Sequence, residues 1–125
     1  MKNKLILLAL SIFLCTLTPA NVFAQEQEPM PAAERAAKLT EWMKNNLQLT
    51  AEQETQAQQI NLKYANKTEE LRTTKDSKMQ KFKKVKAYND SKDKELKEVF
   101  TDEQYKKYQA KKEEVKEEFK TKKKQ

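Results

Sequence analysis

The chain contains no glycine, and its three prolines all lie before residue 32. Glycine and proline are the two residues that most strongly interrupt a helix, so residues 32–125 lack both of the usual breaks. Along this stretch, apolar side chains recur three or four positions apart, which is the spacing of one face of an α-helix. The sequence therefore predicts an all-α fold.

Polar interruptions divide this stretch into four expected helices. A cluster of Thr, Asp and Ser side chains over 72–78 is where we expect the second helix to end. A second polar cluster, over 88–92, is the rival place for the break, although the apolar register runs through it. We prefer a continuous helix there, with Asn89 on its inner face, but both a break near 74–77 and one near 89–91 stay open. The expected helices cover about 32–47, 51–71, 79–100 and 102–121.

The pattern apolar-Thr-x-x-Gln occurs twice, as LTAEQ before the second expected helix and as FTDEQ before the fourth. A threonine at the N-cap accepts a hydrogen bond from the backbone three residues on, and a glutamine there reaches back to the backbone of the cap. Each motif therefore predicts a helix start. Phe100 before the second cap is expected to form a hydrophobic staple with Tyr105, whereas Leu49 has Glu54 at the corresponding position and is expected to pack between helices. The motif residues are Leu49, Thr50 and Gln53, and Phe100, Thr101 and Gln104.

Both ends of the chain are expected to lie outside the folded domain. Two lysines precede an apolar run over 5–17, and small residues follow before Ala24, which is the pattern of a secretory signal peptide. The run is too short for a membrane span, which needs about 20 apolar residues. We therefore expect cleavage near Ala24 and no stable membrane insertion afterwards. The expected organisation is a signal peptide (1–24), a mobile leader (25–31), a single all-helical domain (32–121) and a frayed basic tail (122–125).

The residues that carry most enzyme chemistry are missing from the expected mature chain. It has no histidine, and the one cysteine, Cys15, lies in the signal peptide. This removes the usual zinc, copper and haem ligands and the common Ser-His-Asp and Cys-His arrangements. Carboxylate pairs such as Glu113-Glu114 lie among lysines at helical spacing, the pattern of a solvated helix face. We therefore expect no catalytic residue, no metal site and no cofactor, and we predict that the protein is not an enzyme.

An exported, all-helical chain with LTAEQ and FTDEQ at the starts of successive helical halves resembles the LTXXQ-motif family of periplasmic proteins, the Spy and CpxP group. The resemblance spans the mature chain in its layout, but in sequence it is confined to the two motifs. The second copy has Phe100 where the motif has leucine, which keeps an apolar side chain at that position.

The resemblance implies a four-helix, cradle-like hairpin arrangement that forms an antiparallel homodimer in the periplasm. Proteins of the Spy branch are ATP-independent chaperones that hold unfolded or misfolded proteins on a concave surface. We therefore predict a chaperone-like protein of the envelope-stress response. The alternative, implied by the CpxP branch, is a regulator that binds and restrains the periplasmic domain of an envelope sensor kinase. A related metal-responsive branch uses His-rich or Cys-containing segments, which this chain lacks.

Lysines and apolar residues alternate at the start of the third expected helix. Such a surface attracts clients by charge and holds them loosely by small apolar contacts, and the flexible side chain of Met79 suits varied partners. The alternative is that Phe82 and Val85 belong to the core and that the lysines only solubilise the helix. The narrow apolar stripes suit a protein partner better than a bilayer, and no nucleic-acid partner is expected because no recognition motif is present. The predicted client-binding residues are Lys78, Met79, Lys81, Phe82, Lys83, Lys84, Val85 and Lys86.

Overall fold

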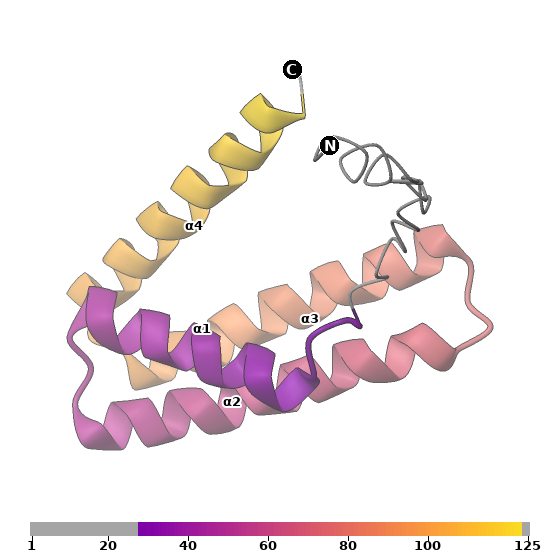
Figure 1. Cartoon of the computed structure of the whole chain (residues 1–125). Coiled ribbons are helices and arrows are strands. Elements are labelled where there is room, and N and C mark those ends of the chain that lie inside the picture. Colours follow the sequence, from indigo (N-terminus) through magenta and orange to yellow (C-terminus); the bar gives the residue numbers. More distant parts are fainter. Residues whose placement is uncertain (1–27, 124–125) are drawn as a thin grey trace, which may run out of the picture.

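The structure is a computed structural model that describes residues 28–123. The expected signal peptide, residues 25–27 of the expected leader and residues 124–125 of the expected tail lie outside the described residues. Within residues 28–123 there are four α-helices and no strand, so the prediction of an all-α fold is confirmed (Figure 1). The elements are α1 (Ala32–Leu47), α2 (Ala51–Glu70), the 3-10 turn η1 (Leu71–Thr73), α3 (Lys78–Val99) and α4 (Asp102–Lys122).

A tight turn joins α1 to α2 in an antiparallel hairpin (Figure 1). Gln48 ends α1 in the left-handed conformation, with φ 54° and ψ 54°. Glycine usually occupies such a position because it has no Cβ to clash, and this glycine-free chain uses glutamine instead. Leu49, the next residue, is buried in the core, as its place before the first motif threonine predicts.

Three of the four helices begin with a capping box. At the start of α2, the Thr50 hydroxyl accepts a hydrogen bond from the Gln53 backbone, and the Gln53 side chain accepts one from the Thr50 backbone. The second motif does the same at the start of α4, so both predicted caps are confirmed. Ser77 and Gln80 form a third box at the start of α3. We did not predict this one, although S-x-x-Q carries the same signature.

A second, longer hairpin consists of α2 and α3, and the chain turns between them over 74–77. The break therefore lies at the first polar cluster, and α3 runs unbroken through the rival position. Lys63 and Tyr64 of α2 each donate a hydrogen bond of 2.6 Å to the carboxylate of Glu95 on α3. Asn89 lines a hollow between α1, α2 and α3, and its side chain is exposed to solvent.

The core is small and lies where the two motif loops come together. All four helices or their flanking loops contribute to it, and Met43 and Leu96 are completely buried. Phe100 contacts Tyr108 edge to face, with 5.9 Å between the ring centroids. The buried cluster consists of Met43, Leu47, Leu49, Ala57, Leu96, Phe100 and Tyr108. Leu49 and Phe100, the apolar residues of the two motifs, therefore belong to the same core.

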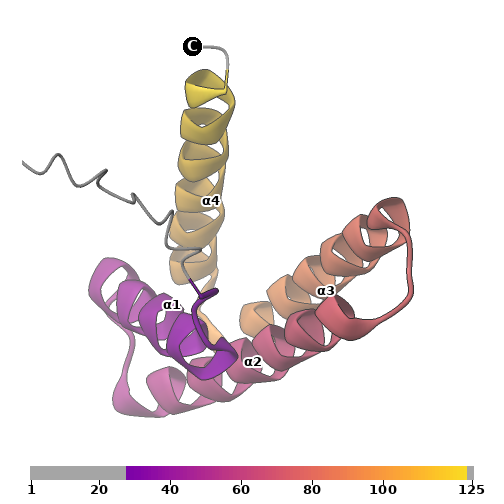
Figure 2. The same ribbon diagram turned by 45° about the vertical axis from the view of Figure 1, so that its right-hand side comes forward.

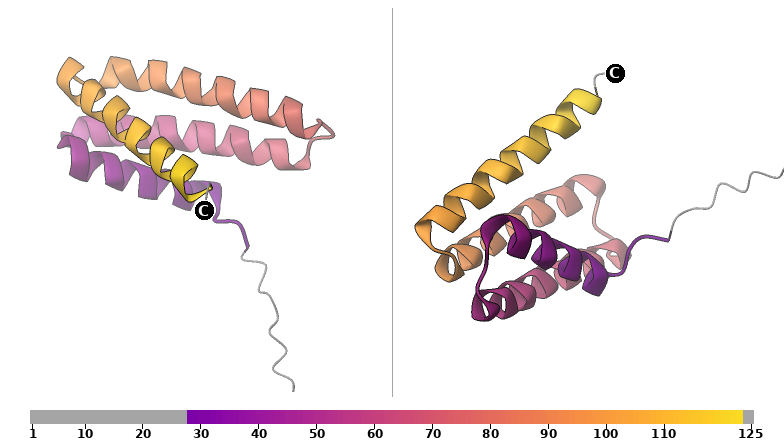
Figure 3. Two further views of the ribbon diagram at one scale, coloured as in Figure 1. Left: turned by 90° about the horizontal axis from the view of Figure 1, so that it is seen from above. Right: turned by 60° about the vertical axis from the view of Figure 1, so that its left-hand side comes forward.

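The last helix leaves this core and projects away from the α2–α3 hairpin (Figures 1 and 2). Seen from above, α1, α2 and α3 lie side by side, and α4 crosses them obliquely (Figure 3). Its first turns are packed, with Tyr108 buried, but toward its end Val115 and Phe119 are exposed. The end of α4 therefore diverges from α1 and α3 and leaves these two side chains open to solvent.

Candidate functional site

The two motif glutamines bind each other and lock the two loops together. Gln53 Nε2 donates to Gln104 Oε1 at 2.8 Å, and Gln104 Nε2 donates to Gln53 Oε1 at 3.1 Å. The same nitrogens also donate to the backbone carbonyls of Val99 and Leu47, each of which precedes the other motif. We call this pair of residues the glutamine clasp. It explains why the motif occurs twice: each glutamine caps its own helix and holds the opposite loop.

A second polar contact fixes the direction in which α4 leaves the core. The hydroxyl of Tyr108 donates to Asp93 Oδ1 at 2.8 Å, and Lys112 forms an ion pair with the other oxygen of the same carboxylate. Burial and the neighbouring Asp93 carboxylate raise the pKa of Tyr108 well above its usual value, so the phenol stays protonated and keeps donating. The first half of α4 is therefore tied to α3 by side chains from two of its successive turns.

Beyond the contact of Tyr108 and Lys112 with Asp93, an open groove lies between α4 and the helices α1 and α3. Leu39 and Trp42 line it from α1, Phe82 and Lys92 line it from α3, and α4 supplies the remaining wall. We use the word groove for the surface formed by these residues together with Tyr108, Lys111, Lys112, Val115, Lys116, Phe119, Lys120 and Lys123.

The chemistry of the groove is limited to two kinds of side chain. Half of its twelve lining residues are apolar or aromatic, the other half are lysines, and none is acidic. Phe82 is 66% exposed and Phe119 is 69% exposed, so both rings lie open to solvent. Exposed aromatic side chains of this size on one surface are typical of sites that bind another molecule. The groove is thus an apolar strip with a cationic border.

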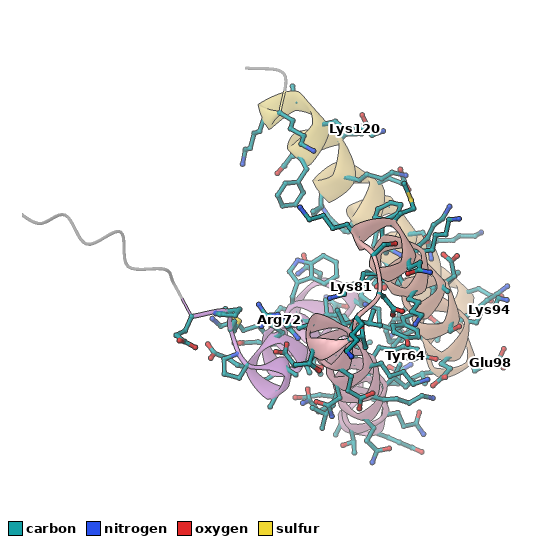
Figure 4. All side chains as sticks on the ribbon, turned by 90° about the vertical axis from the view of Figure 1, so that its right-hand side faces the viewer. Tyr64, Arg72, Lys81, Lys94, Glu98 and Lys120 are labelled. Atoms are coloured by element: carbon teal, nitrogen blue, oxygen red, sulfur yellow. The ribbon has the colours of Figure 1, made fainter. Side chains whose placement is uncertain are left out.

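Only one of the predicted client-binding residues, Phe82, lines the groove. The alternative that Phe82 belongs to the core is wrong, because its ring is mostly exposed. Val85 is half-buried. Two of the lysines hold the α2–α3 turn: Lys81 donates to the carbonyl of Arg72 at 3.2 Å, and Lys84 pairs with Asp76 at 2.6 Å (Figure 4). The others, Lys78, Met79, Lys83 and Lys86, are exposed around the first turns of α3. The predicted set therefore surrounds α3 instead of forming one face.

Sequence reasoning missed most of the groove. Val115 and Phe119 follow Tyr108 at helical spacing, so the sequence places all three on one apolar stripe of the fourth helix. Nothing in the pattern indicates that the stripe of α4 is partnered at Tyr108 and open from Val115 onward. One signal was available: lysines flank this stripe at four-residue spacing, at Lys112, Lys116 and Lys120.

Residues 28–123 contain no cluster of three or more His, Cys, Asp or Glu side chains that could hold a metal ion. No helix in the same range is both long and apolar enough to cross a membrane.

Comparison with known proteins gives one match. A family model described as "Domain of unknown function (DUF4890)" matches residues 20–108, which include both motifs and the start of α4 as far as Tyr108. No curated protein and no solved structure matches the chain.

Proposed function

The chain belongs to the DUF4890 family, and from the groove we propose that it is a chaperone-like protein that holds unfolded polypeptides without ATP. The observation that carries the proposal is the lining of the groove, in which exposed aromatic rings alternate with lysines and no carboxylate intervenes. Unfolded chains expose the apolar side chains that a folded protein buries, and those side chains suit such a strip.

Weak and reversible binding is what this surface favours. The lysines Lys111, Lys116 and Lys120 pair with glutamates three residues away on the same exposed helix face. Exposed pairs of this kind contribute little free energy and are screened by salt, so their lysines can exchange partners at low cost. Phe82 and Phe119 offer apolar contacts without an enclosed pocket. A client can therefore be attracted by charge, held by a few side chains and released without an energy source.

The experiment is an aggregation-suppression assay with several unrelated unfolding clients, without nucleotide, at two salt concentrations. We expect suppression by the wild type at near-stoichiometric amounts and loss of suppression in the double variant Phe82→Ser with Phe119→Ser. Met79→Ser is the matched control, because Met79 is also exposed, at 62%, but does not line the groove. We expect the control to suppress aggregation like the wild type.

Other outcomes of this assay would contradict the proposal. If a demonstrably folded wild type suppresses no client, the better hypothesis is the regulator that binds a single sensor-kinase domain. Such a regulator would bind one partner tightly and lose it on discrete substitutions. If Met79→Ser loses as much activity as the double variant, the groove is not the binding surface.

A homodimer in the periplasm stays a prediction. Its test is sedimentation combined with melting at several protein concentrations, because a dimer that is more stable than its monomer melts at a higher temperature when concentrated. A monomer mass with a melting temperature independent of concentration would contradict it.

A further inference from the structure

The groove continues into a second, more polar hollow. Arg35, Asn61, Tyr64, Thr68 and Asn89 are among the residues that line this hollow, which lies between α1, α2 and α3 and measures about 250 Å³. We call it the polar hollow. Leu39 and Lys92 line both the polar hollow and the groove, which itself measures about 780 Å³. The groove and the polar hollow therefore meet at these two side chains.

Lys92 differs from four of the other five lysines of the groove in its partners, and from the fifth, Lys123, in its burial, because Lys123 is exposed just after the end of α4. Lys111, Lys112, Lys116 and Lys120 each form an ion pair with a carboxylate of the chain. For Lys92, residues 28–123 provide no ion pair and no side-chain hydrogen bond, although it is partly buried. Its neighbour Asp93 is already engaged by Tyr108 and Lys112. Burial lowers the pKa of the Lys92 amine, as expected of an ammonium removed from water without a partner.

The pairing of the groove lysines indicates where a ligand's anionic group would bind. Three of the six groove lysines pair with glutamates of α4 itself, and Lys112 pairs with Asp93 of α3, whereas the partly buried Lys92, unpaired within the described residues, lies at the junction with the polar hollow. A ligand with many acidic groups along its length would meet compensated lysines, whereas a ligand with one anionic end would meet Lys92. Phe82 and Lys92 are ten residues apart on α3, about 15 Å at the rise of an α-helix, which is the extended length of about twelve methylenes.

We propose that the groove and the polar hollow together bind one fatty acid, with its carboxylate on Lys92 and its alkyl chain along the groove. The carboxylate gives Lys92 the charge-assisted partner that it lacks. The alkyl chain covers Leu39, Trp42 and the exposed rings of Phe82 and Phe119, which removes apolar surface from water. A volume of about 780 Å³ is in the range of sites that hold small ligands. The inference goes beyond the proposed holding of polypeptides, because it assigns a lipid ligand to the site.

The test uses the tryptophan that the groove already contains. Trp42 is the single tryptophan of the chain, so its fluorescence reports on the groove without a label. Tetradecanoate is titrated into the protein below the concentration at which it forms micelles, and the stoichiometry is read by native mass spectrometry. We expect a saturable change with one molecule bound. Shorter acids should bind more weakly, by about fourfold for each methylene removed.

The decisive variant is Lys92→Gln, with Lys94→Gln as its matched control. Both changes remove one positive charge from α3, but Lys94 is exposed and points away from the groove side of the helix (Figure 4). We expect Lys92→Gln to weaken tetradecanoate binding about tenfold and Lys94→Gln to leave it unchanged. A neutral alkyl glucoside of the same chain length should bind both variants and the wild type alike. Circular dichroism and melting curves establish that both variants are folded.

Three results would overturn the proposal. Equal loss of affinity in Lys92→Gln and Lys94→Gln would mean that net charge, and not this lysine, attracts the acid. Binding of many molecules without saturation would mean that the acid coats the protein as a detergent. Tight one-to-one binding of an acidic amphipathic peptide or a single-stranded oligonucleotide, with no saturable response to the acid, would assign the groove to a different ligand. None of these results depends on the aggregation assay, so the two proposals fail independently.

Discussion

The two halves of α4 have similar sequences but different surroundings. In the first half, Gln104 joins the glutamine clasp, Tyr108 is 2% exposed and Lys112 pairs with Asp93 on α3. In the second half, Val115 and Phe119 continue the same apolar stripe but are 46% and 69% exposed. The ion pairs of that half, such as Lys120 with Glu117, lie within α4 itself.

This contrast shows that an amphipathic stripe does not by itself form a core. In the first half, Tyr108 of the stripe contacts Phe100, and Gln104 joins the clasp. The second half lies beyond these contacts. Its apolar side chains then border an open groove. The packed half should therefore control the stability of the fold, and the open half should control binding. Four predictions test that division.

The largest expected effect distinguishes the two aromatic residues of the stripe. Tyr108→Ala should lower the free energy of unfolding by about 3–5 kcal/mol, because it empties a buried site beside Phe100. Phe119→Ala should change it by less than about 0.5 kcal/mol, because the ring is mostly exposed. Urea unfolding followed by circular dichroism measures both values. Similar losses in the two variants would mean that the second half of α4 is packed after all.

The glutamine clasp should contribute the next largest effect. Gln53→Ala and Gln104→Ala should each cost about 2 kcal/mol, because each leaves partly buried polar groups without hydrogen bonds. The double variant should cost clearly less than the sum, since the second substitution removes a partner already lost. A double-mutant cycle measures this coupling. Gln80→Ala is the control, because Gln80 caps α3 without a partner in another loop. Additive losses would exclude the clasp as a unit.

The helix caps should have smaller effects. Thr50→Ala, Ser77→Ala and Thr101→Ala should each lower stability by about 1 kcal/mol, because each removes a side-chain acceptor for the first turn of a helix. Helix content at low temperature should stay the same. Thermal melting followed at 222 nm measures the shift. Variants that melt like the wild type would exclude the capping account.

The smallest expected effect concerns pH and compares an ion pair between helices with one inside α4. Hydrogen bonds from Lys63 and Tyr64 lower the pKa of Glu95 below its ordinary value of 4.5, and Lys120 lowers the pKa of Glu117 in the same way. A carboxyl whose pKa is lower in the folded state stabilises the fold above its unfolded pKa. That contribution is lost as the pH falls below 4.5 and through the folded value.

Of these two carboxylates, Glu95 alone joins two helices, so protonation of Glu95, and not of Glu117, should loosen the hairpin of α2 and α3. Glu95→Gln should therefore reduce the fall in melting temperature between about pH 6 and pH 3. Glu117→Gln, the matched control in the open half of α4, should reduce that fall much less, because its pair with Lys120 is exposed and screened by solvent. An equal effect of both variants would mean that the pair between helices has no special role.

Much of the local structure could be predicted from the sequence. The caps at Thr50 and Thr101, the bounds of α1 and the all-α fold follow from helix chemistry that acts over three or four residues. The third cap, at Ser77, was equally accessible and was missed because no apolar residue precedes it as in the two motifs. The site was predicted only at Phe82, because the remaining groove residues, apart from Lys92, come from α1 and α4, far away in sequence.

The sequence by itself determined the all-α fold, the bounds of α1 and the starts of α2 and α4, because capping and periodicity are interactions between near neighbours along the chain. It also placed Lys112, Lys116 and Lys120 along the apolar stripe of α4. Only the tertiary structure decided that Gln53 and Gln104, 51 residues apart, bind each other. Only it decided that α4 is packed as far as Lys112 and open beyond. Those outcomes depend on the angle between helices, which is set by contacts between distant residues such as Asp93 and Tyr108 and not by any pattern within one helix.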